Sequence, residues 1–232
     1  MSSGFPHARH YTRRVARRVL ALFAKAPVPG AVKTRLAPEL TAEGAAAFYE
    51  AMLLDVLDQY ADARDCELAL WFTPDESRDW FEKHSPQRFR LLQQRGADLA
   101  ERMRALFQFH ASEGFERIVL RGTDSPTLPA SRVAQAFAAL EHAPLVLCPD
   151  LDGGYNLIGQ SAPHDALFDL ELSRASVLAA TLSRARELGL RAELLPAHHD
   201  VDTWQDLVRL GAELDPARTP RTLSQYRALV AH

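Results

Sequence analysis

The chain has 232 residues, of which 47% are hydrophobic and 25% are charged, and its formal net charge is −3. This composition is typical of a globular protein with one substantial core, and the near-neutral charge argues against nucleic acid as the main partner. No apolar run approaches the roughly 20 residues that cross a bilayer, so we expect no membrane span.

A basic extension, residues 1–17, precedes a single predicted domain at residues 18–232. Arginines are frequent in and beside this extension, at Arg9, Arg13, Arg14, Arg17 and Arg18. The apolar run that follows is short and has no small-residue cleavage site, which disfavours a signal peptide. A basic arm for a membrane or nucleic acid is the alternative to a solvated tail, and we favour the tail because chain ends are commonly solvated.

Apolar runs alternate with amphipathic segments along the rest of the chain, and these patterns predict strands and helices respectively. The predicted strands are 18–24, 66–72, 89–92, 118–120, 145–148, 155–158 and 190–195. The predicted helices are 41–60, 99–110, 131–140, 176–188, 204–210 and 223–230, with a short helix around residue 80. We expect Thr41 and Thr203 to cap helices and Gly189 to end one. The alternation predicts a three-layer α/β/α domain with a mostly parallel sheet.

The two cysteines, Cys66 and Cys148, both fall inside predicted strands and have no CxxC neighbour. We therefore expect two buried thiols in a reducing compartment, which indicates a cytoplasmic protein.

A loop rich in proline and glycine follows the first predicted strand and carries the cations Lys25, Lys33 and Arg35. An arginine fork and a lysine point charge suit the phosphates of a di- or triphosphate. The glycine spacing differs from that of a Walker A loop. The alternative is a solvated charged loop, but the prolines make this loop rigid, which favours phosphate binding.

Two predicted strands are followed by acidic residues, Asp124 after Gly122 and Asp152 before Gly153 and Gly154. Ligands of an open α/β sheet bind beyond the carboxyl ends of its strands, so we expect both carboxylates to face one crevice. There they could hold a divalent cation on a phosphate. Asp124 stands several residues too early to cap the helix at 131. Asp152 could equally belong to a plain turn, whereas in a site its glycines would make room for a sugar or an acceptor.

The run from Asp200 to Thr203 has two interpretations. It could be only a helix cap, or it could bring a second metal ligand to the crevice. His198 and His199 precede it, but they lack the i,i+4 spacing of a helical zinc pair. We expect both to be ordinary surface histidines.

Six short motifs occur in order between Val19 and Leu210. They are Phe23–Gly30, Lys33–Leu36, Gly96–Met103, Gly122–Pro126, Asp152–Tyr155 and Asp200–Thr203. Together they resemble a bacterial family of GT-A-type glycosyltransferases, often labelled arsenosugar-biosynthesis glycosyltransferases. The chain is more distantly similar to the phospholactate and molybdopterin guanylyltransferases.

The resemblance implies a Rossmann-like GT-A nucleotide-diphospho-sugar transferase fold. It also implies that Lys33 and Arg35 contact the nucleotide phosphates, and that Asp124 and Asp202 bind Mg²⁺ or Mn²⁺. The other motif residues expected to bind the nucleotide are Lys25, Gly30, Gly96 and Asp98. Those expected at the sugar or acceptor are Gly153, Gly154 and Tyr155.

The expected activity is transfer from a nucleoside-diphosphate sugar to a small-molecule acceptor, assisted by a divalent metal, with Asp152 as the acceptor-activating base. The alternative enzyme is a guanylyltransferase-like nucleotidyltransferase, which would join a nucleoside triphosphate to a phosphorylated small molecule and release pyrophosphate. A third possibility is a nucleotide-binding protein without turnover. The oligomeric state is not predicted.

Overall fold

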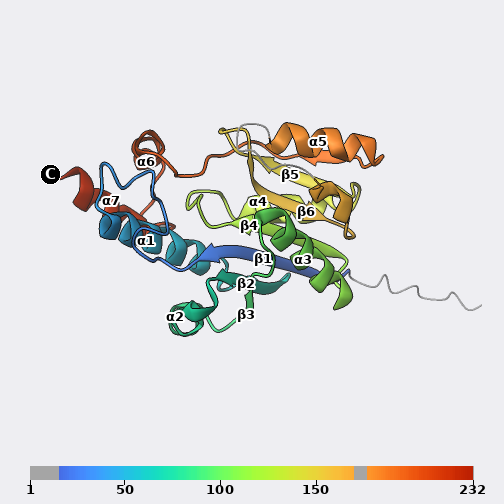
Figure 1. The fold of residues 1–232 in the computed structure, drawn as a ribbon, viewed down its shortest axis with the longest axis horizontal. Helices are drawn as coiled ribbons and strands as arrows, with labels where there is room; N and C mark the ends of the chain where they lie inside the picture. Colours follow the sequence, from blue (N-terminus) through green and yellow to red (C-terminus); the bar gives the residue numbers. More distant parts are fainter. Residues whose placement is uncertain (1–15, 170–176, 232) are drawn as a thin grey trace, which may run out of the picture.

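A seven-stranded sheet forms the centre of the molecule (Figure 1). The structure is a computed structural model, which describes residues 16–169 and 177–231. The strands follow the order β3-β2-β1-β4-β6-β5-β7. Their bounds are Arg18–Lys25 for β1, Glu67–Thr73 for β2, Phe89–Gln93 for β3, Arg117–Gly122 for β4, Leu145–Pro149 for β5, Tyr155–Gln160 for β6 and Ala192–Leu194 for β7.

The sheet is mostly parallel, as predicted. β1 pairs in parallel with β2 and β4, β2 with β3, and β5 with β7. Within the described residues β6 is the exception, because it pairs antiparallel with both β4 and β5. The short turn between β5 and β6 makes these strands a hairpin, and a hairpin can only be antiparallel. Consequently β6 begins at the edge where β1 and β4 end.

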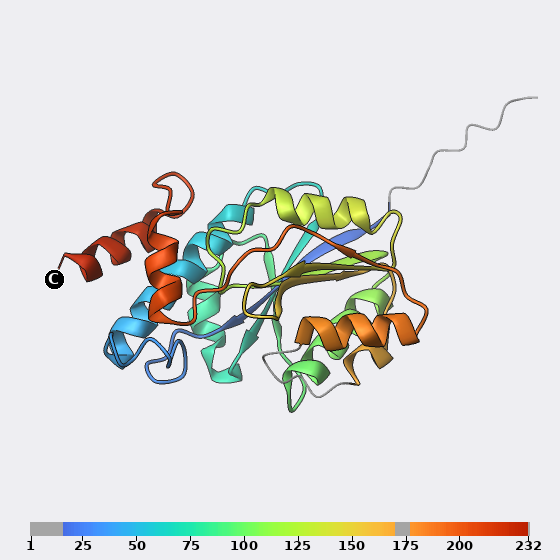
Figure 2. The same cartoon turned by 90° about the horizontal axis from the view of Figure 1, so that it is seen from above.

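Helices cover both faces of this sheet (Figure 2). The α-helices are α1 Ala42–Tyr60, α2 Arg78–His84, α3 Leu99–Ser112, α4 Ser131–Ala139, α5 Val177–Glu187, α6 Trp204–Gly211 and α7 Pro220–Val230. Two 3₁₀ turns, η1 Asp75–Ser77 and η2 Asp165–Phe168, complete the elements. The predicted start of α5 at residue 176 and most of the N-terminal extension lie outside the described residues. The three-layer α/β/α prediction is confirmed.

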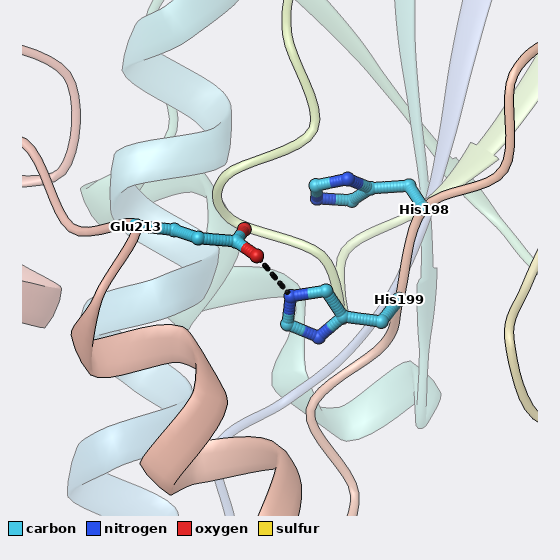
Figure 3. A group of neighbouring side chains, drawn as sticks. All are labelled: His198, His199 and Glu213. Atoms are coloured by element: carbon cyan, nitrogen blue, oxygen red, sulfur yellow. Dashed lines mark hydrogen bonds and ion pairs between the residues drawn. The ribbon is translucent and has the colours of Figure 1, made fainter.

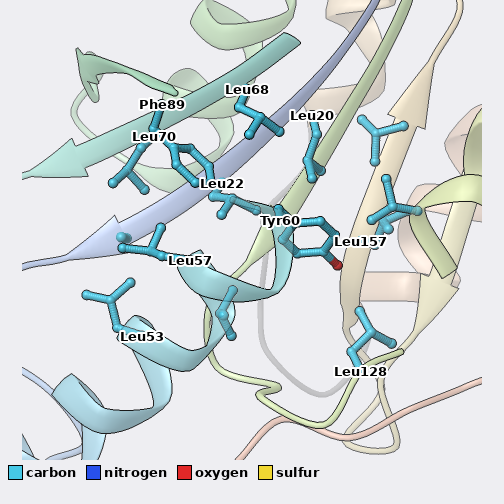
Figure 4. Packing of buried hydrophobic residues seen from close by; sticks show 14 of the residues in the cluster. Leu20, Leu22, Leu53, Leu57, Tyr60, Leu68, Leu70, Phe89, Leu128 and Leu157 are labelled. Atoms are coloured by element: carbon cyan, nitrogen blue, oxygen red, sulfur yellow. The ribbon is translucent and has the colours of Figure 1, made fainter. Parts of the chain in front are cut away.

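Alternate residues of each strand supply two hydrophobic cores. Leu20 and Leu22 of β1 point to the face covered by α1 and α4, where Leu53 and Leu57 of α1 meet them (Figure 4). Val19 and Ala21, together with side chains of α3 and α5, form the core on the other face. The apolar strand runs of the sequence exist because both faces of the sheet are buried.

A third hydrophobic cluster joins the outer side of α1 to the C-terminal helices. Phe48 and Met52 of α1 contact Leu207 and Leu210 of α6, and Leu36 from the loop after β1 is fully buried among them. α7 also packs against α1. This cluster attaches two loops, residues 26–41 and 195–203, to one rigid helix.

The predicted helix ends are confirmed. The Thr41 side chain accepts a hydrogen bond from the backbone N–H of Gly44 at the start of α1. Thr203 caps α6 in a reciprocal capping box with Asp206. Gly189 follows α5 with φ +68°, a left-handed conformation that glycine adopts without strain.

Two predictions about single residues are wrong. Cys66 lies one residue before β2 and is only partly buried, because strand β2 begins at Glu67, whereas Cys148 in β5 is buried as expected. His199 is not a surface histidine, since its residue is only 4% exposed, and His198 is half-buried beside it. The buried ring of His199 is hydrogen-bonded to the carboxylate of Glu213, a residue distant in the sequence, and this bond satisfies its Nε2.

No helix among the described residues is both long and apolar enough to cross a membrane.

Candidate functional site

A cavity of about 490 Å³ opens at the edge of the sheet where β1 and β4 end and β6 begins. Its walls come from the loop after β1, the N-terminal half of α3, the residues after β4, and the segment before α6. This is the edge at which ligands of open α/β sheets bind. Among the residues predicted for the site, Lys25, Lys33, Arg35, Asp124, Tyr155 and Asp202 all border the cavity.

The loop after β1 takes its path from three features. Gly30 has φ +77° and Lys33 has φ +46°, so the chain turns twice in the left-handed region. Leu36 then anchors the loop by burying its side chain against α1. Because Leu36 points inward, its neighbour Arg35 is exposed at the rim while Lys33 is directed into the cavity.

Lys33 joins the two predicted metal ligands. Its ammonium forms ion pairs with Asp124 and with Asp202, the latter at 3.1 Å between Nζ and Oδ1. The lysine side chain is only 3% exposed, whereas the carboxylates are 40% and 39% exposed. Arg35 adds a longer ion pair, 3.8 Å from Nη1 to Oδ2 of Asp202. The structure therefore brings these four residues together at one cavity, while their roles remain predictions.

The charge on Lys33 is strongly held. Burial by itself would lower the pKa of Lys33, but the carboxylates of Asp124 and Asp202 outweigh burial and raise that pKa above its ordinary value. The ammonium therefore stays protonated at neutral pH. The cation that Asp124 and Asp202 share in this structure is therefore the Lys33 ammonium, a group of the protein itself.

Backbone contacts hold the two aspartates beside each other. The N–H of Val201 donates a 3.0 Å hydrogen bond to the carbonyl of Asp124. Val201 is fully buried in the third cluster, and Thr203 starts α6 two residues later. The segment before α6 is thus fixed on both sides of Asp202.

Asp200, for which the sequence left both a cap and a site role open, borders the cavity. Its carboxylate accepts a hydrogen bond from the Ser125 hydroxyl, and its backbone N–H donates to Asp150 Oδ1 at 3.1 Å. Burial, followed by the charges of Asp124 and Asp150, raises the pKa of Asp200. Three carboxylates, Asp124, Asp200 and Asp202, thus border the cavity together with the cations Lys25, Lys33, Arg35 and Arg102.

Tyr49 of α1 supports the floor of the cavity. Its phenol oxygen accepts a hydrogen bond from the Lys25 backbone N–H at 3.1 Å and lies 3.1 Å from Thr123 Oγ1. Burial raises the pKa of Tyr49 to about 12, and the charge of Asp124 adds to this effect. Tyr49 therefore remains a neutral hydrogen-bonding group that connects the ends of β1 and β4. No motif in the sequence indicated this role.

Asn156 of β6 is the second unexpected cavity residue. The residue borders the cavity and is only 4% exposed, and neither Oδ1 nor Nδ2, both shielded from solvent, has a hydrogen-bond partner among the described residues. Buried amides are nearly always hydrogen-bonded in folded proteins. An orphaned donor and acceptor in the cavity wall therefore indicate a ligand, or water, that completes them. A lone asparagine after Tyr155 carries no sequence signal for this.

Six predicted site residues do not border this cavity. Asp98 caps α3 by accepting from the Glu101 N–H at 2.8 Å, and Gly96 packs so closely on α3 that an added Cβ would lie 2.8 Å from the Arg102 nitrogen. Gly30 makes the turn described above. Asp152 is exposed in the turn between β5 and β6, where Oδ1 accepts from Gly154 N–H at 2.8 Å. Gly153, with φ +96°, belongs to the same turn, so the roles of these residues in binding or catalysis remain predictions.

The donor set suits the divalent cation that the resemblance implies. Asp124 and Asp202 offer hard oxygen ligands, and both already face one positive charge at the cavity wall. Mg²⁺ and Mn²⁺ are commonly held by one or two carboxylates plus phosphate oxygens. These residues therefore fit such an ion, provided that Lys33 moves to another anion.

Sequence comparison places residues 56–171 in the family described as "Uncharacterized protein conserved in bacteria (DUF2064)". None of the curated proteins is significantly similar to this chain.

Solved structures share the fold at two levels of similarity. A "putative nucleotide-diphospho-sugar transferase" from Desulfovibrio desulfuricans G20 is 31% identical, with a TM-score of 0.84 over 93% of this chain and 96% of that one. A cytidylyltransferase from Leptospira borgpetersenii is 11% identical, with a TM-score of 0.55 over 93% of both chains. A CMP:2-keto-3-deoxy-manno-octonic acid synthetase complexed with CTP is also 11% identical, with a TM-score of 0.51 over 84% of this chain and 97% of that one. The predicted fold is confirmed by these likenesses.

Proposed function

This chain belongs to the DUF2064 family, and from that premise and its cavity we propose that it is a transferase acting on a nucleoside-diphosphate sugar with a divalent metal. One observation carries the proposal: Lys33, Arg35, Asp124 and Asp202 meet at the carboxyl edge of the sheet. The 31% identical neighbour, described as a "putative nucleotide-diphospho-sugar transferase", supports the same reaction class. Fold likeness alone would not, because one fold serves many reactions.

The mixed charges of the cavity suit a diphosphate leaving group. Lys33 and Arg35 would bind the phosphate oxygens, with Arg35 free to do so because it is exposed at the rim. Asp124 and Asp202 would hold Mg²⁺ or Mn²⁺, which would neutralise charge on the departing diphosphate. Preorganised charges that face a developing negative charge are usually the largest single contribution to catalysis.

The remaining groups suit the sugar and the acceptor. Asn156 has an unpartnered N–H₂ and an unpartnered carbonyl that are shielded from solvent, and a rotation of its side chain toward the cavity would offer them to the hydroxyls of a sugar. Tyr155, whose phenol has a pKa raised to about 12 by burial, stays neutral beside it. Asp152 is retained as the proposed acceptor base, and this role requires the turn between β5 and β6 to approach the acceptor.

The alternative is nucleotidyl transfer, in which the same charges would bind a nucleoside triphosphate. A cytidylyltransferase and a synthetase bound to CTP share this fold at 11% identity, so the alternative is tested alongside the first reaction. The two reactions release different products, a nucleoside diphosphate in the first case and pyrophosphate in the second.

The decisive experiment measures both products from the full chain. We would incubate it with a panel of nucleotide sugars and acceptors, and separately with nucleoside triphosphates and sugar phosphates, with Mg²⁺ or Mn²⁺. Asp124→Asn should lower kcat about 100-fold or more, because it removes one of the two proposed metal ligands. The matched control is Asp62→Asn, since Asp62 is fully exposed after α1 and away from the cavity.

Each result has a defined meaning. Diphosphate release that depends on Asp124 supports the proposal, whereas pyrophosphate release supports the alternative. Binding of nucleotides, seen as thermal stabilisation that survives Asp124→Asn without any product, would indicate a binding protein instead. If no nucleotide binds, both enzymatic readings fail.

A further inference from the structure

Two histidines and a glutamate form a second polar cluster outside the cavity (Figure 3). His198 and His199 lie between β7 and α6, and Glu213 lies just after α6. One ligand atom from each residue lies within 4.8 Å of the other two. None of the three borders the cavity that contains Asp124. The cluster is therefore unexplained by the proposed reaction.

The spacing of these atoms is close to that of a metal site. His199 Nε2 and Glu213 Oε1 are 3.0 Å apart. In a tetrahedral zinc site with bonds of about 2.0–2.1 Å, two ligand atoms lie roughly 3.3 Å apart. The separation of this pair is thus close to that of two ligands of one ion, and the His199 ring would turn so that its nitrogen points at the ion instead of at the carboxylate. The rings of His198 and His199 have centroids 5.0 Å apart, so a rotation of the His198 side chain would bring a nitrogen toward the same point.

We propose that His198, His199 and Glu213 bind one Zn²⁺ ion. Imidazole nitrogen is a good ligand for zinc, whereas Mg²⁺ prefers oxygen ligands alone, so the cluster differs in metal preference from the two aspartates of the cavity. The Glu213 side chain is 37% exposed, which leaves solvent access for a water molecule in the fourth position. Binding would release the proton shared by His199 and Glu213, because a ligating nitrogen must offer its lone pair.

The position of the cluster indicates what the ion would do. The Thr127 hydroxyl, in the loop after β4, donates to Glu213 at 2.9 Å and lies 3.1 Å from His198 Nε2. The cluster thus gathers the loop after β4, the segment before α6 and the residue after α6. Zinc would link these three segments. One of its ligands, His199, directly precedes Asp200, which borders the cavity. Because the ion would hold these segments together, its removal should lower stability.

The first test uses the full chain without an affinity tag, treated with a chelator and then titrated with Zn²⁺. Calorimetry should give one bound ion per chain. Zinc at roughly 100 times its Kd should raise the Tm by several degrees. X-ray absorption of the zinc-loaded protein should show nitrogen and oxygen ligands at about 2.0–2.1 Å, with the outer-shell pattern of two imidazoles.

The second test assigns the ligands. Glu213→Gln keeps the size and hydrogen-bonding capacity of the side chain, and it should weaken zinc binding at least about 100-fold, as should His198→Ala. The control His142→Ala removes an exposed histidine near the end of α4 and should bind zinc like the parent chain. Asp124→Asn should also retain the ion, which separates this site from the cavity.

Three results would overturn the proposal. They are the absence of a bound ion in the parent chain, undiminished binding in Glu213→Gln, and loss of the ion in Asp124→Asn. Thermal unfolding of each variant without metal provides the folding control. If His198→Ala does not fold, the Glu213→Gln result decides alone.

Discussion

Lys33 is the residue on which the chemistry of the cavity depends most directly. Its ammonium is buried between Asp124 and Asp202, in the place where a divalent ion would share the same two carboxylates. In the proposed reaction the lysine therefore binds phosphate. Without substrate, its ammonium competes with a metal ion for the two carboxylates. These two roles can be separated by measuring metal binding without nucleotide.

We expect Lys33→Met to bind Mn²⁺ alone more tightly than the parent chain, because the competing charge is gone. Turnover should nevertheless fall about 100-fold or more, because a cation that faces the leaving group is lost. Titration followed by paramagnetic relaxation gives the first quantity and product release the second. Lys83→Met, at an exposed position of α2, should change neither. Weaker Mn²⁺ binding in Lys33→Met would show that the lysine does not occupy the metal position.

His110 provides a separate prediction at the residue scale, in the core of the molecule. Its Nε2 accepts a 3.0 Å hydrogen bond from the Trp71 indole, and its ring is almost fully buried. Burial lowers the pKa of His110 to about 4, while Glu113 and Glu67 act to raise the pKa and Arg90 acts to lower it. In the unfolded chain the pKa returns to about 6.5.

The sign of the pH effect follows from these two values. Between pH 6.5 and 4 the unfolded chain takes up a proton that the folded protein refuses, so this group costs stability as the pH falls through that window. The loss should approach about 3 kcal/mol at pH 4. Urea unfolding of the parent chain and of His110→Gln, measured from pH 7 to pH 4, should show a shallower decline in the variant. Parallel curves would contradict the assignment.

At the scale of elements, α6 fixes the second aspartate. The Thr203 hydroxyl accepts from the Asp206 N–H at 3.3 Å, and the Thr203 backbone N–H donates to Asp206 Oδ2 at 2.9 Å, which completes the capping box. Asp202 is the residue directly before this cap, and its N–H also reaches Asp206 Oδ2 at 3.3 Å. The start of the helix and Asp202, the proposed metal ligand, are thus held by one carboxylate.

Thr203→Ala should cost about 1 kcal/mol, the usual effect of losing an N-cap. For a chain of this size the Tm should fall by about 2–4 °C. Differential scanning calorimetry provides the measurement. Gln205→Ala is the matched control, because it alters an exposed residue of the same helix without touching the cap. An unchanged Tm in Thr203→Ala would mean that α6 is held by its packing on α1 alone.

At the scale of the whole molecule, β6 joins the two halves of the sheet through a close approach at Gly159. A Cβ at this position would lie 2.7 Å from Val146 Cγ1 and 3.1 Å from Leu140 Cδ1. Gly159→Ala should therefore destabilise the protein by about 1–3 kcal/mol through overpacking.

Gly44→Ala is the control for the Gly159 substitution. Its Cβ would meet Thr41 Oγ1 at 3.5 Å, an ordinary contact, and alanine is the better helix former. The free energy of unfolding of Gly44→Ala should equal that of the parent chain or exceed it by up to about 1 kcal/mol. The free energy of unfolding in urea compares the two variants. Equal stability of Gly159→Ala and the parent chain would show that the sheet tolerates a wider separation at this point.

Much of this fold could be predicted from the sequence because its signals are local. Apolar runs such as 118–120 are buried strands whatever their neighbours, and Thr41 and Thr203 cap helices through contacts three residues away. The parallel arrangement then brings the ends of β1 and β4 to one edge. That rule predicted that Asp124 would face this crevice, but it predicted the same of Asp152, which is exposed in the turn between β5 and β6 and does not border the cavity.

Other features depend on long-range packing and could not be predicted. The burial of Lys33 between two carboxylates requires the turn at Gly30 and the anchoring of Leu36 under α6. The burial of His199 depends on its hydrogen bond to Glu213, and Glu213 reaches it only because α6 packs against α1. The lack of a hydrogen-bond partner for the Asn156 amide depends on every residue around it, so the sequence alone could not predict it.

The hydrogen bond from Val201 N–H to the Asp124 carbonyl has a consequence for how this protein can diverge. Both partners are main-chain atoms, which every residue except proline supplies equally. Substitutions around the cavity can therefore change which substrate fits without altering the distance between the two acidic segments. Under the proposed function, the preference for the sugar donor and the acceptor substrate can therefore differ among relatives. The distance between the segments that carry Asp124 and Asp202 stays the same.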